Sequence, residues 1–214
     1  MLHYNTVNSI LKSSLDVLMK TDEFESFRLV GGTSLSLQIG HRISVDIDIF
    51  TEVEYGSIDF TLLENSLTTH FDYLDYTHGL NTAFGKSYTI GKSKDESVKL
   101  DIFYTDTFIT DELIIDNIRL ASIEEIIAMK VDVIQRGGRK KDFWDLHELL
   151  DKYSISEMIN LHEKRYPYSH DKNLIISNFT DFYIADDDFD PICLRGKYWE
   201  FIKDDFIELL NKYV

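Results

Sequence analysis

One eight-residue stretch decides how the rest of the chain is interpreted: Ile43-Ser44-Val45-Asp46-Ile47-Asp48-Ile49-Phe50. Its odd positions are all β-branched aliphatic residues, which is the strict alternation of a strand with one buried face. Because successive strand side chains point to opposite faces, the four aliphatic residues are expected on the core face. Asp46 and Asp48 then share the other face, about 7 Å apart along the strand.

A second stretch repeats this alternation: Val98-Lys99-Leu100-Asp101-Ile102-Phe103-Tyr104. If the two strands are near neighbours, Asp46, Asp48 and Asp101 converge on one patch of sheet. Converging carboxylates repel one another unless a cation neutralises them, and hard oxygen ligands suit Mg²⁺. Two such ions would serve a displacement at phosphorus. Taken alone, the Asp-x-Asp pattern is more typical of an exposed, acidic strand face than of a metal site.

The run Gly31-Gly32-Thr33-Ser34 lies between an expected strand and an expected helix. Free backbone N–H groups and the positive end of a helix dipole at such a junction favour phosphate binding. A tight turn capped by Thr33 is the plainer alternative. The chain contains neither the Walker pattern nor G-x-G-x-x-G, which argues against a P-loop NTPase or a dinucleotide-binding fold.

The patterns divide the chain into a mixed front half and a helical back half, which predicts an α/β (α+β) fold with two domains, 1–118 and 119–214. Front-half helices are expected at 6–20, 33–39 and 57–71, and further strands at 27–30, 73–77 and 84–91. In the back half, Ser122 and Glu125 fit a capping box that starts a helix, and Gly137-Gly138 ends it. Later helices are expected at 139–153, 154–165, 171–183 and 196–213.

Composition excludes several classes of protein. The 214 residues carry 22 basic and 38 acidic side chains, a net charge of −16, which disfavours general nucleic-acid coating. No apolar run is long enough to span a membrane, and the first residues do not resemble a signal peptide. A single cysteine, Cys193, fits a cytoplasmic protein. The basic cluster Arg136, Arg139, Lys140 and Lys141 would be the local docking site for an anionic acceptor, or simply a solvated helix end.

Gly31 to Leu35 and His41 to Phe50 resemble the nucleotidyltransferase signature of the polymerase-β superfamily, and more narrowly that of the AbiEii/AbiGii toxin family. Glu125 to Lys130 is similar to that family's lysine motif. Arg139 to Leu146 is similar to its Arg-x-Lys-Asp-x-x-Asp-Leu motif. The resemblance covers residues 28–150, and the remainder matches only as generic helices.

Lys130 supports this interpretation independently, because it lies on the apolar stripe of its helix with Ile123, Ile127 and Ile134. Its ammonium either snorkels to the surface or reaches the nucleotide phosphates. The predicted catalytic residues are Asp46, Asp48, Asp101 and Lys130, of which the three aspartates bind Mg²⁺. The predicted nucleotide-binding residues are Gly31, Gly32, Thr33, Ser34, Arg42 and Lys130, and the resemblance implies that Asp142 and Asp145 also line this site or contact the base or the acceptor. The predicted acceptor-binding residues are Arg136, Arg139 and Lys140.

The predicted function is Mg²⁺-dependent transfer of a nucleotidyl group from an NTP to an acceptor hydroxyl, with release of pyrophosphate. The helical domain is expected to close the nucleotide cleft. The resemblance implies a toxin of an abortive-infection or toxin–antitoxin system, the acceptor end of tRNA as substrate and a cognate antitoxin. Two alternatives stay open: transfer to a small hydroxylated molecule such as an aminoglycoside, for which an acidic cleft suits a cationic acceptor, and an inactive binding scaffold.

Overall fold

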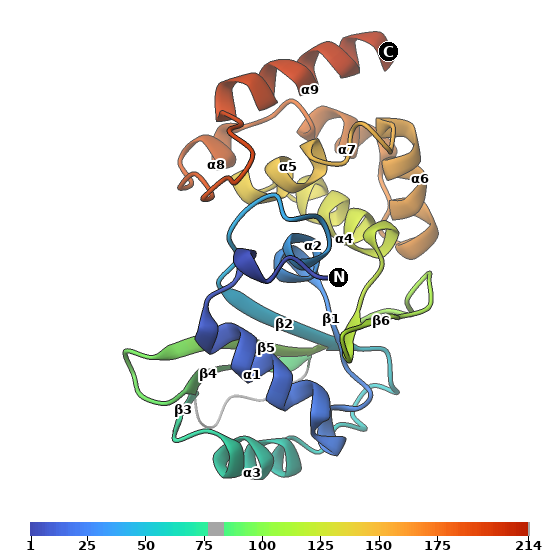
Figure 1. Cartoon of the computed structure of the whole chain (residues 1–214). Helices are drawn as coiled ribbons and strands as arrows, with labels where there is room; N and C mark the ends of the chain where they lie inside the picture. The colour runs from blue at the N-terminus through green and yellow to red at the C-terminus, as the bar shows by residue number, and fades with distance from the viewer. Residues whose placement is uncertain (77–83, 214) are drawn as a thin grey trace. The chain divides into compact units, whose positions relative to one another are not determined.

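The computed structural model describes residues 1–76 and 84–213, which divide into two compact units (Figure 1). The first unit comprises Met1–Gly40 and Ser44–Ala121, and the second comprises His41–Ile43 and the chain from Ser122 onward. The expected division at 118/119 differs from this in two places. Residues 119–121 complete the first unit, and the short segment 41–43 folds with the helices of the second.

The first unit contains a mixed β-sheet with strand order β3-β4-β5-β2-β1-β7-β6. The strands are β1 (Arg28–Leu29), β2 (Asp46–Thr51), β3 (Tyr73–Tyr76), β4 (Gly85–Gly91), β5 (Ser97–Tyr104), β6 (Leu113–Ile115) and β7 (Ile118–Leu120). Strand β2 lies in the middle, parallel to β5 and antiparallel to β1. This mixed sheet with flanking helices confirms the predicted α/β class. Residue 77, the last of one expected strand, lies outside the described residues.

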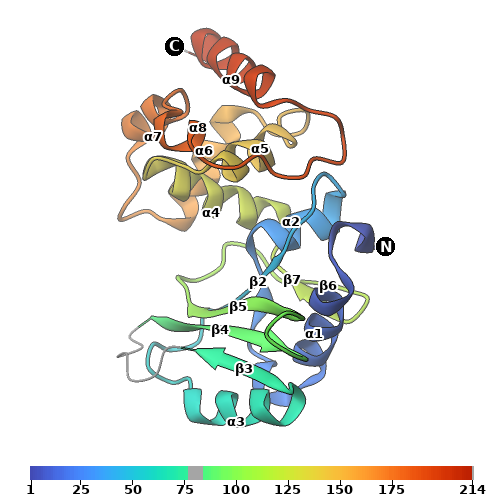
Figure 2. The ribbon, with the colours of Figure 1, turned by 90° about the vertical axis from the view of Figure 1, so that its left-hand side faces the viewer.

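Helices cover one face of this sheet. The unit contains α1 (Ser9–Lys20), α2 (Gly31–Ile39) and α3 (Phe60–His70), with short 3₁₀ turns at Tyr4–Thr6 and Asp22–Phe24. Asn8 and Asp59 cap the N-termini of α1 and α3 through their side chains. The buried apolar residues of both helices belong to one core cluster with the aliphatic side chains of β2 and β5, and Figure 2 shows the helices beside the sheet. The face that carries the even-numbered residues of β2 is therefore the half-exposed one.

Strand β2, which carries Asp46 and Asp48, begins later than its sequence predicts. It begins at Asp46 rather than Ile43, and the expectation that Val45 lies in the core is wrong, because Val45 is 58% exposed. The backbone before Asp46 is bonded elsewhere. Ser44 donates its N–H to the carbonyl of Thr6, and Ile43 donates its N–H to Ile192 within the second unit. Alternation along the chain could not reveal these bonds.

A short hairpin, β6–β7, was not predicted. Its turn residues Asp116 and Asn117 have positive φ angles of 53° and 64°, the conformation of a two-residue hairpin turn that Asp and Asn tolerate. The signal was present in the sequence as two apolar runs around Asp-Asn. Each strand has three residues, which is too short for the alternation to be recognised.

The second unit is helical: α4 (Ile123–Gln135), α5 (Lys140–His147), α6 (Ile155–Arg165), α7 (Lys172–Asn178), α8 (Tyr183–Asp186) and α9 (Trp199–Tyr213). Phe143 is at the centre of its aromatic core, with the rings of Phe182, Trp199 and Phe206 between 5.2 and 5.9 Å from it. The expected helix 139–153 ends early, at His147. The expected helix 171–183 is shorter than predicted: α7 ends at Asn178, and α8 begins only at Tyr183, the last residue of the expected range.

Half of the expected capping box of α4 is present. Ser122 accepts from the N–H of Glu125, as predicted. The carboxylate of Glu125 instead forms an ion pair with Arg165, and both side chains are fully buried. None of the helices among the described residues combines the length and apolarity that crossing a membrane requires.

Candidate functional site

Three aspartates lie together on the half-exposed face of the sheet. In the parallel pairing of β2 with β5, Asp48 is in register with Asp101, and Asp46 is in register with Lys99. Residues in register on neighbouring strands project from the same face, and positions two apart on one strand do so too. The structure thus places Asp46, Asp48 and Asp101, which we call the acidic triad, side by side on two adjacent strands.

Lys99 supplies a positive charge beside the acidic triad. Its Nζ donates to Asp101 Oδ2 at 2.5 Å. Partial burial disfavours the charged ammonium, but the bond to Asp101 and the charges of all three aspartates outweigh it and raise the pKa of Lys99. The Lys99 side chain is nevertheless 52% exposed. The three carboxylates therefore favour a positive charge at this position, and the flexible side chain of Lys99 supplies one.

The donors of the acidic triad fit a hard divalent cation. Carboxylate oxygens are the ligands that Mg²⁺ prefers, and Oδ1 of Asp101 is buried without a hydrogen-bond partner among the described residues. As the side chains stand, the described residues contain no group of three or more His, Cys, Asp or Glu arranged to hold a metal ion. Lys99 is bonded to Oδ2 of Asp101, so a metal ion at that oxygen would require the ammonium to turn away.

The glycine run lies next to the acidic triad. Gly31 begins α2 with a φ of 65°, and a Cβ at this position would stand 3.0 Å from Asp48 Oδ2. Glycine therefore satisfies both the backbone conformation and the close approach of the Asp48 carboxylate. Gly32 follows in the first turn of α2, so its N–H belongs to the unsatisfied N-terminus of a nine-residue helix.

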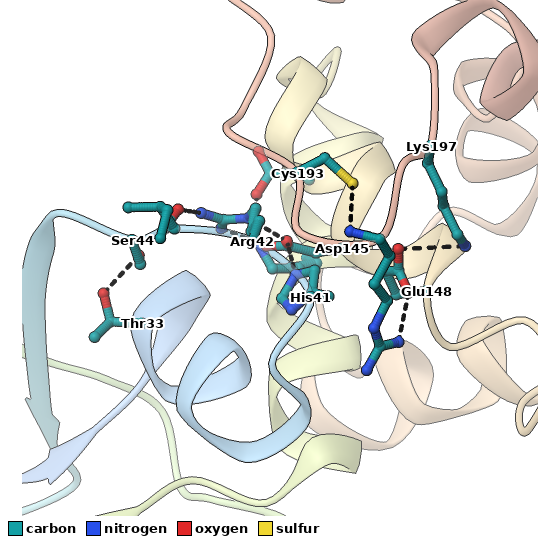
Figure 3. A network of polar contacts seen from close by, with 12 residues as sticks. Thr33, His41, Arg42, Ser44, Asp145, Glu148, Cys193 and Lys197 are labelled. Carbon is teal, nitrogen blue, oxygen red and sulfur yellow. Dashed lines mark hydrogen bonds and ion pairs between the residues drawn. The ribbon is translucent and has the colours of Figure 1, made fainter. Parts of the chain in front are cut away.

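The hydroxyls of Thr33 and Ser34 are used inside the protein. Thr33 is bonded to the Ser44 hydroxyl at 2.7 Å (Figure 3), and it also donates to the carbonyl of Asp46. Ser34 is fully buried and accepts from Gln38. These bonds fasten α2 to the start of β2. What this segment offers a phosphate is its backbone N–H groups and helix dipole, rather than the two hydroxyls.

A buried ion network occupies the second unit, and we call it the Asp145 network. Asp145 Oδ1 accepts from Arg42 Nε at 2.6 Å and lies 2.6 Å from His41 Nε2, while its Oδ2 accepts from a second guanidinium nitrogen of Arg42 at 2.8 Å (Figure 3). Lys130 Nζ lies 2.7 Å from Asp145 Oδ2 and donates to Asp142 Oδ1 at 2.6 Å. All five side chains are at least nine-tenths buried.

The charges of this network are matched. Burial alone would raise the pKa of Asp145, but the cationic Arg42 and Lys130 hold it well below its ordinary value. Burial likewise disfavours the Lys130 ammonium, yet Asp142 and Asp145 raise the pKa of Lys130. The inward position predicted for Lys130 is observed. The contact of Arg42, Lys130, Asp142 and Asp145 with nucleotide stays a prediction, because here the cations are paired with the two aspartates.

The basic cluster is also paired with acids. Arg136 pairs with Asp132, Arg139 lies 3.2 Å from Asp188, and Lys140 lies 2.9 Å from Asp190. The Arg136 and Arg139 side chains remain 67% and 56% exposed, whereas that of Lys140 is 7% exposed. Of the three predicted acceptor-binding residues, the two arginines are thus the ones exposed enough to meet a large anionic acceptor.

Two participants were missed at the level of sequence. His41 had no assigned role, although it contributes to the Asp145 network. Lys99 was placed on the acidic face without a function, and its position two residues before Asp101 in the same alternation was the available signal. His41 offered no such signal, because its partner is 104 residues away.

Comparison with known proteins gives consistent results over nearly the whole chain. The family described as "Nucleotidyl transferase AbiEii toxin, Type IV TA system" matches residues 14–212. A protein of Aquifex aeolicus (strain VF5), the uncharacterized protein aq_aa25, is 26% identical over 95% of both chains.

Two solved structures share the fold. One is a protein from H. pylori that is assigned as a nucleotidyltransferase, with a TM-score of 0.61 and 20% identity over 94% of this chain and 92% of that one. The other is MenT4, the nucleotidyltransferase toxin Rv2826c of Mycobacterium tuberculosis H37Rv, with a TM-score of 0.56 and 15% identity over 94% and 82%. Nucleotidyltransferases of this kind generally use an NTP and a divalent metal ion. Since the family match spans almost the entire sequence, this chain belongs to the AbiEii family of toxins and is a nucleotidyltransferase.

Proposed function

We propose that the protein transfers a nucleotidyl group from an NTP to an acceptor hydroxyl in a Mg²⁺-dependent reaction at the acidic triad. One observation carries the proposal: Asp48 and Asp101 stand in register on parallel strands, with Asp46 two residues along on the same face. Nothing in the packing of the sheet requires three carboxylates on a single patch, and their mutual repulsion would destabilise the fold unless cations bind there.

The chain's own residues account for each part of the reaction. Asp46, Asp48 and Asp101 would hold Mg²⁺, which supplies positive charge to the phosphate oxygens. The N-terminus of α2 at Gly31 and Gly32 binds the outer phosphates through backbone N–H groups. Asp101 accepts the proton of the acceptor hydroxyl. The hydroxyl oxygen forms a bond to the α-phosphorus, the bond to the bridging oxygen breaks, and pyrophosphate leaves.

The acceptor we favour is the acceptor end of tRNA, with a cognate antitoxin limiting the activity. Membership of a toxin family supports a target whose modification stops growth. The exposed Arg136 and Arg139 support an anionic acceptor. The net charge of −16 favours a second candidate, a small cationic hydroxylated molecule such as an aminoglycoside.

Label transfer distinguishes these candidates. The full chain is incubated with Mg²⁺, each α-labelled NTP in turn, and either total tRNA or an aminoglycoside. Label on tRNA supports the toxin assignment, and label on the aminoglycoside supports the second candidate. If label reaches neither acceptor and growth inhibition survives in Asp48→Asn, the protein acts as a binding scaffold and the proposal is wrong.

Asp48→Asn is expected to lower the transfer rate by about 10²–10³-fold, the typical loss when one group that stabilises the transition-state charge is removed. Asp75→Asn is the matched control, because Asp75 is an exposed aspartate on β3 of the same sheet. Both variants should unfold at the temperature of the wild type or above. Equal loss of activity in the two variants would contradict the assignment of the acidic triad.

A further inference from the structure

The half-exposed face of the sheet continues beyond the acidic triad as an aromatic surface. Phe50 is in register with Phe103, two residues further along β2 and β5 than the Asp48–Asp101 pair. The two ring centroids are 5.9 Å apart, and the ring planes are inclined by 57°. At the rise of a strand, this pair of rings begins about 7 Å from the carboxylates.

Both rings belong to the same face as the aspartates. The neighbouring residues Ile49 and Ile102 are completely buried in the core on the other face, whereas Phe50 and Phe103 are only partly buried. Two large aromatic residues on the open face of a central strand pair are not needed for the core, which α1 and α3 already complete on the other face.

Gly85 on β4 makes room for one of the rings. It is in register with Phe103, and a Cβ at this position would lie 2.5 Å from Phe103 Cγ and 2.3 Å from the carbonyl oxygen of Ile102. Any side chain here would therefore displace the Phe103 ring. Glycine in a central strand usually weakens it, and it commonly marks a place where another group approaches the backbone closely.

The opposite border of the aromatic surface is polar and fixed. Arg28 is in register with Phe50 on β1. Its guanidinium donates to Glu52 Oε1 at 3.2 Å and to the carbonyl of Thr110 at 3.0 Å, and stacks 3.7 Å from the ring centre of Phe108. The Phe50–Phe103 surface thus has a rigid charged edge on one side and a glycine on the other.

We propose that the Phe50–Phe103 pair is a stacking platform for a nucleobase during the nucleotidyl transfer assigned to the acidic triad. This inference rests on the proposed function, because it takes the reacting phosphorus to lie at the carboxylates. A ribose separates the base from the phosphorus of a nucleotide, and the rings lie at a comparable separation from the aspartates. Aromatic side chains stack on every base, since every base has a π-face. The base belongs either to the NTP or to the terminal nucleotide of an RNA acceptor.

Equilibrium binding tests the platform without requiring transfer. The full chain and the variants Phe50→Leu and Phe103→Leu are titrated in Mg²⁺ with each of the four NTPs, with ribose 5-triphosphate, and with total tRNA. Leucine keeps an apolar side chain and removes the flat ring. If the platform holds the NTP base, NTP binding weakens about tenfold and ribose 5-triphosphate binding is unchanged. If it holds the acceptor base, tRNA binding weakens about tenfold and NTP binding is unchanged.

The controls separate stacking from general damage. Phe50→Tyr and Phe103→Tyr keep the ring and should bind like the wild type. Phe71→Leu removes a partly buried ring that packs against the core, and should change no affinity. The inference is overturned if neither NTP nor tRNA binding changes, if ribose 5-triphosphate is weakened as much as the NTPs, or if Phe71→Leu has the same effect. Ring-dependent binding without label transfer would leave the platform standing while the proposed function fails.

Discussion

At the scale of single residues, Lys99 competes with any metal ion for the acidic triad. Its ammonium is bonded to Asp101 and attracted by Asp46 and Asp48, so it neutralises part of their charge. Because about half of this side chain is exposed, turning it into solvent costs little. Lys99 therefore offsets part of the repulsion among the three carboxylates and leaves them accessible to a metal ion.

Lys99→Met is therefore expected to bind Mg²⁺ about fivefold more tightly than the wild type, because a like charge within a few ångströms of the cation is removed. Isothermal titration of the full chain with MgCl₂ measures this. Lys94→Met, an exposed lysine in the β4–β5 turn, is the control and should not change the affinity. An unchanged or weaker affinity in Lys99→Met would mean that Mg²⁺ does not bind at the acidic triad.

Residue positions were predictable where a period determined them. The alternation of 46, 48 and 101 and the helical stripe containing Lys130 both place side chains correctly. The partners of those side chains were not predictable. Arg42 and Asp145 are 103 residues apart, so no local pattern relates them. The prediction that Val45 is buried was wrong because the alternation in the sequence starts at residue 43, whereas the hydrogen-bonded strand starts only at Asp46.

At the scale of elements, segment 41–43 is held by the Asp145 network and by its backbone. Arg42 forms an isolated β-bridge with Cys193, and the N–H of Leu194 donates to the carbonyl of His41 at 2.9 Å. Three chain segments, 41–43, α4 and α5, thus meet at a single carboxylate. A buried carboxylate with several charged partners is costly to alter, because its removal leaves those partners unpaired.

Asp145→Asn is accordingly expected to lower the free energy of unfolding by about 3–5 kcal/mol, since Arg42 and Lys130 lose their shared counter-charge in a buried site. Urea unfolding followed by circular dichroism measures the loss. The control is Asp205→Asn: this aspartate is 53% exposed beside His147, and its loss should cost less than about 1 kcal/mol. Similar losses in both variants would show that Asp145 does not stabilise the unit.

The stability of Asp145→Asn should also depend on pH differently from that of the wild type. The folded pKa of Asp145 is depressed below its ordinary 3.8, so its stabilising contribution is present above that pH and is lost as the pH falls through the folded value. The folded pKa of Lys130 is raised above 10.5, so its contribution is present below that pH and is lost as the pH rises through the folded value. Asp145→Asn should therefore lose less stability than the wild type on acidification below pH 3.8. A parallel acid limb in the two proteins would contradict this.

Helices and strands, like single residues, were predictable where a long periodic pattern determined them. Long periodic segments such as α1, α4 and β5 were predicted within a few residues of their bounds. The helix expected at 139–153 ended at His147 because the residues after it form turns, with bonds such as that from Lys152 N to Leu149 O. The short elements β6, β7 and α8 have too few residues to show a period.

At the scale of the whole molecule, the net charge of −16 repels RNA, whereas the basic cluster attracts it. Acid–base pairing reduces the positive potential of the basic cluster, and Arg136 and Arg139 are its most exposed members, so we expect them to contribute most to any attraction for RNA. Attraction of this kind is visible in the dependence of affinity on salt, because each phosphate contact releases counterions.

The double variant Arg136→Ala/Arg139→Ala should reduce the slope of log K for tRNA against log salt concentration by about 1.4, or about 0.7 for each lost phosphate contact. Filter binding between 50 and about 200 mM KCl gives the slope. Arg195→Ala is the control, because Arg195 is 42% exposed and also paired with an acid, Glu148. Equal slopes in the double variant and the wild type would remove the basic cluster from the acceptor site.

Because residues 41–43 fold with the second unit, the gene cannot be divided between the two units at a single point. The chain passes between the units after Gly40, after Ile43 and after Ala121, so no single cut yields two complete pieces. A fragment starting at Ser122 would leave Asp145 without Arg42 and His41, and one ending at Ala121 would carry that arginine with no carboxylate to receive it. Replacing either unit by fusion at one point would therefore separate Asp145 from Arg42 and His41.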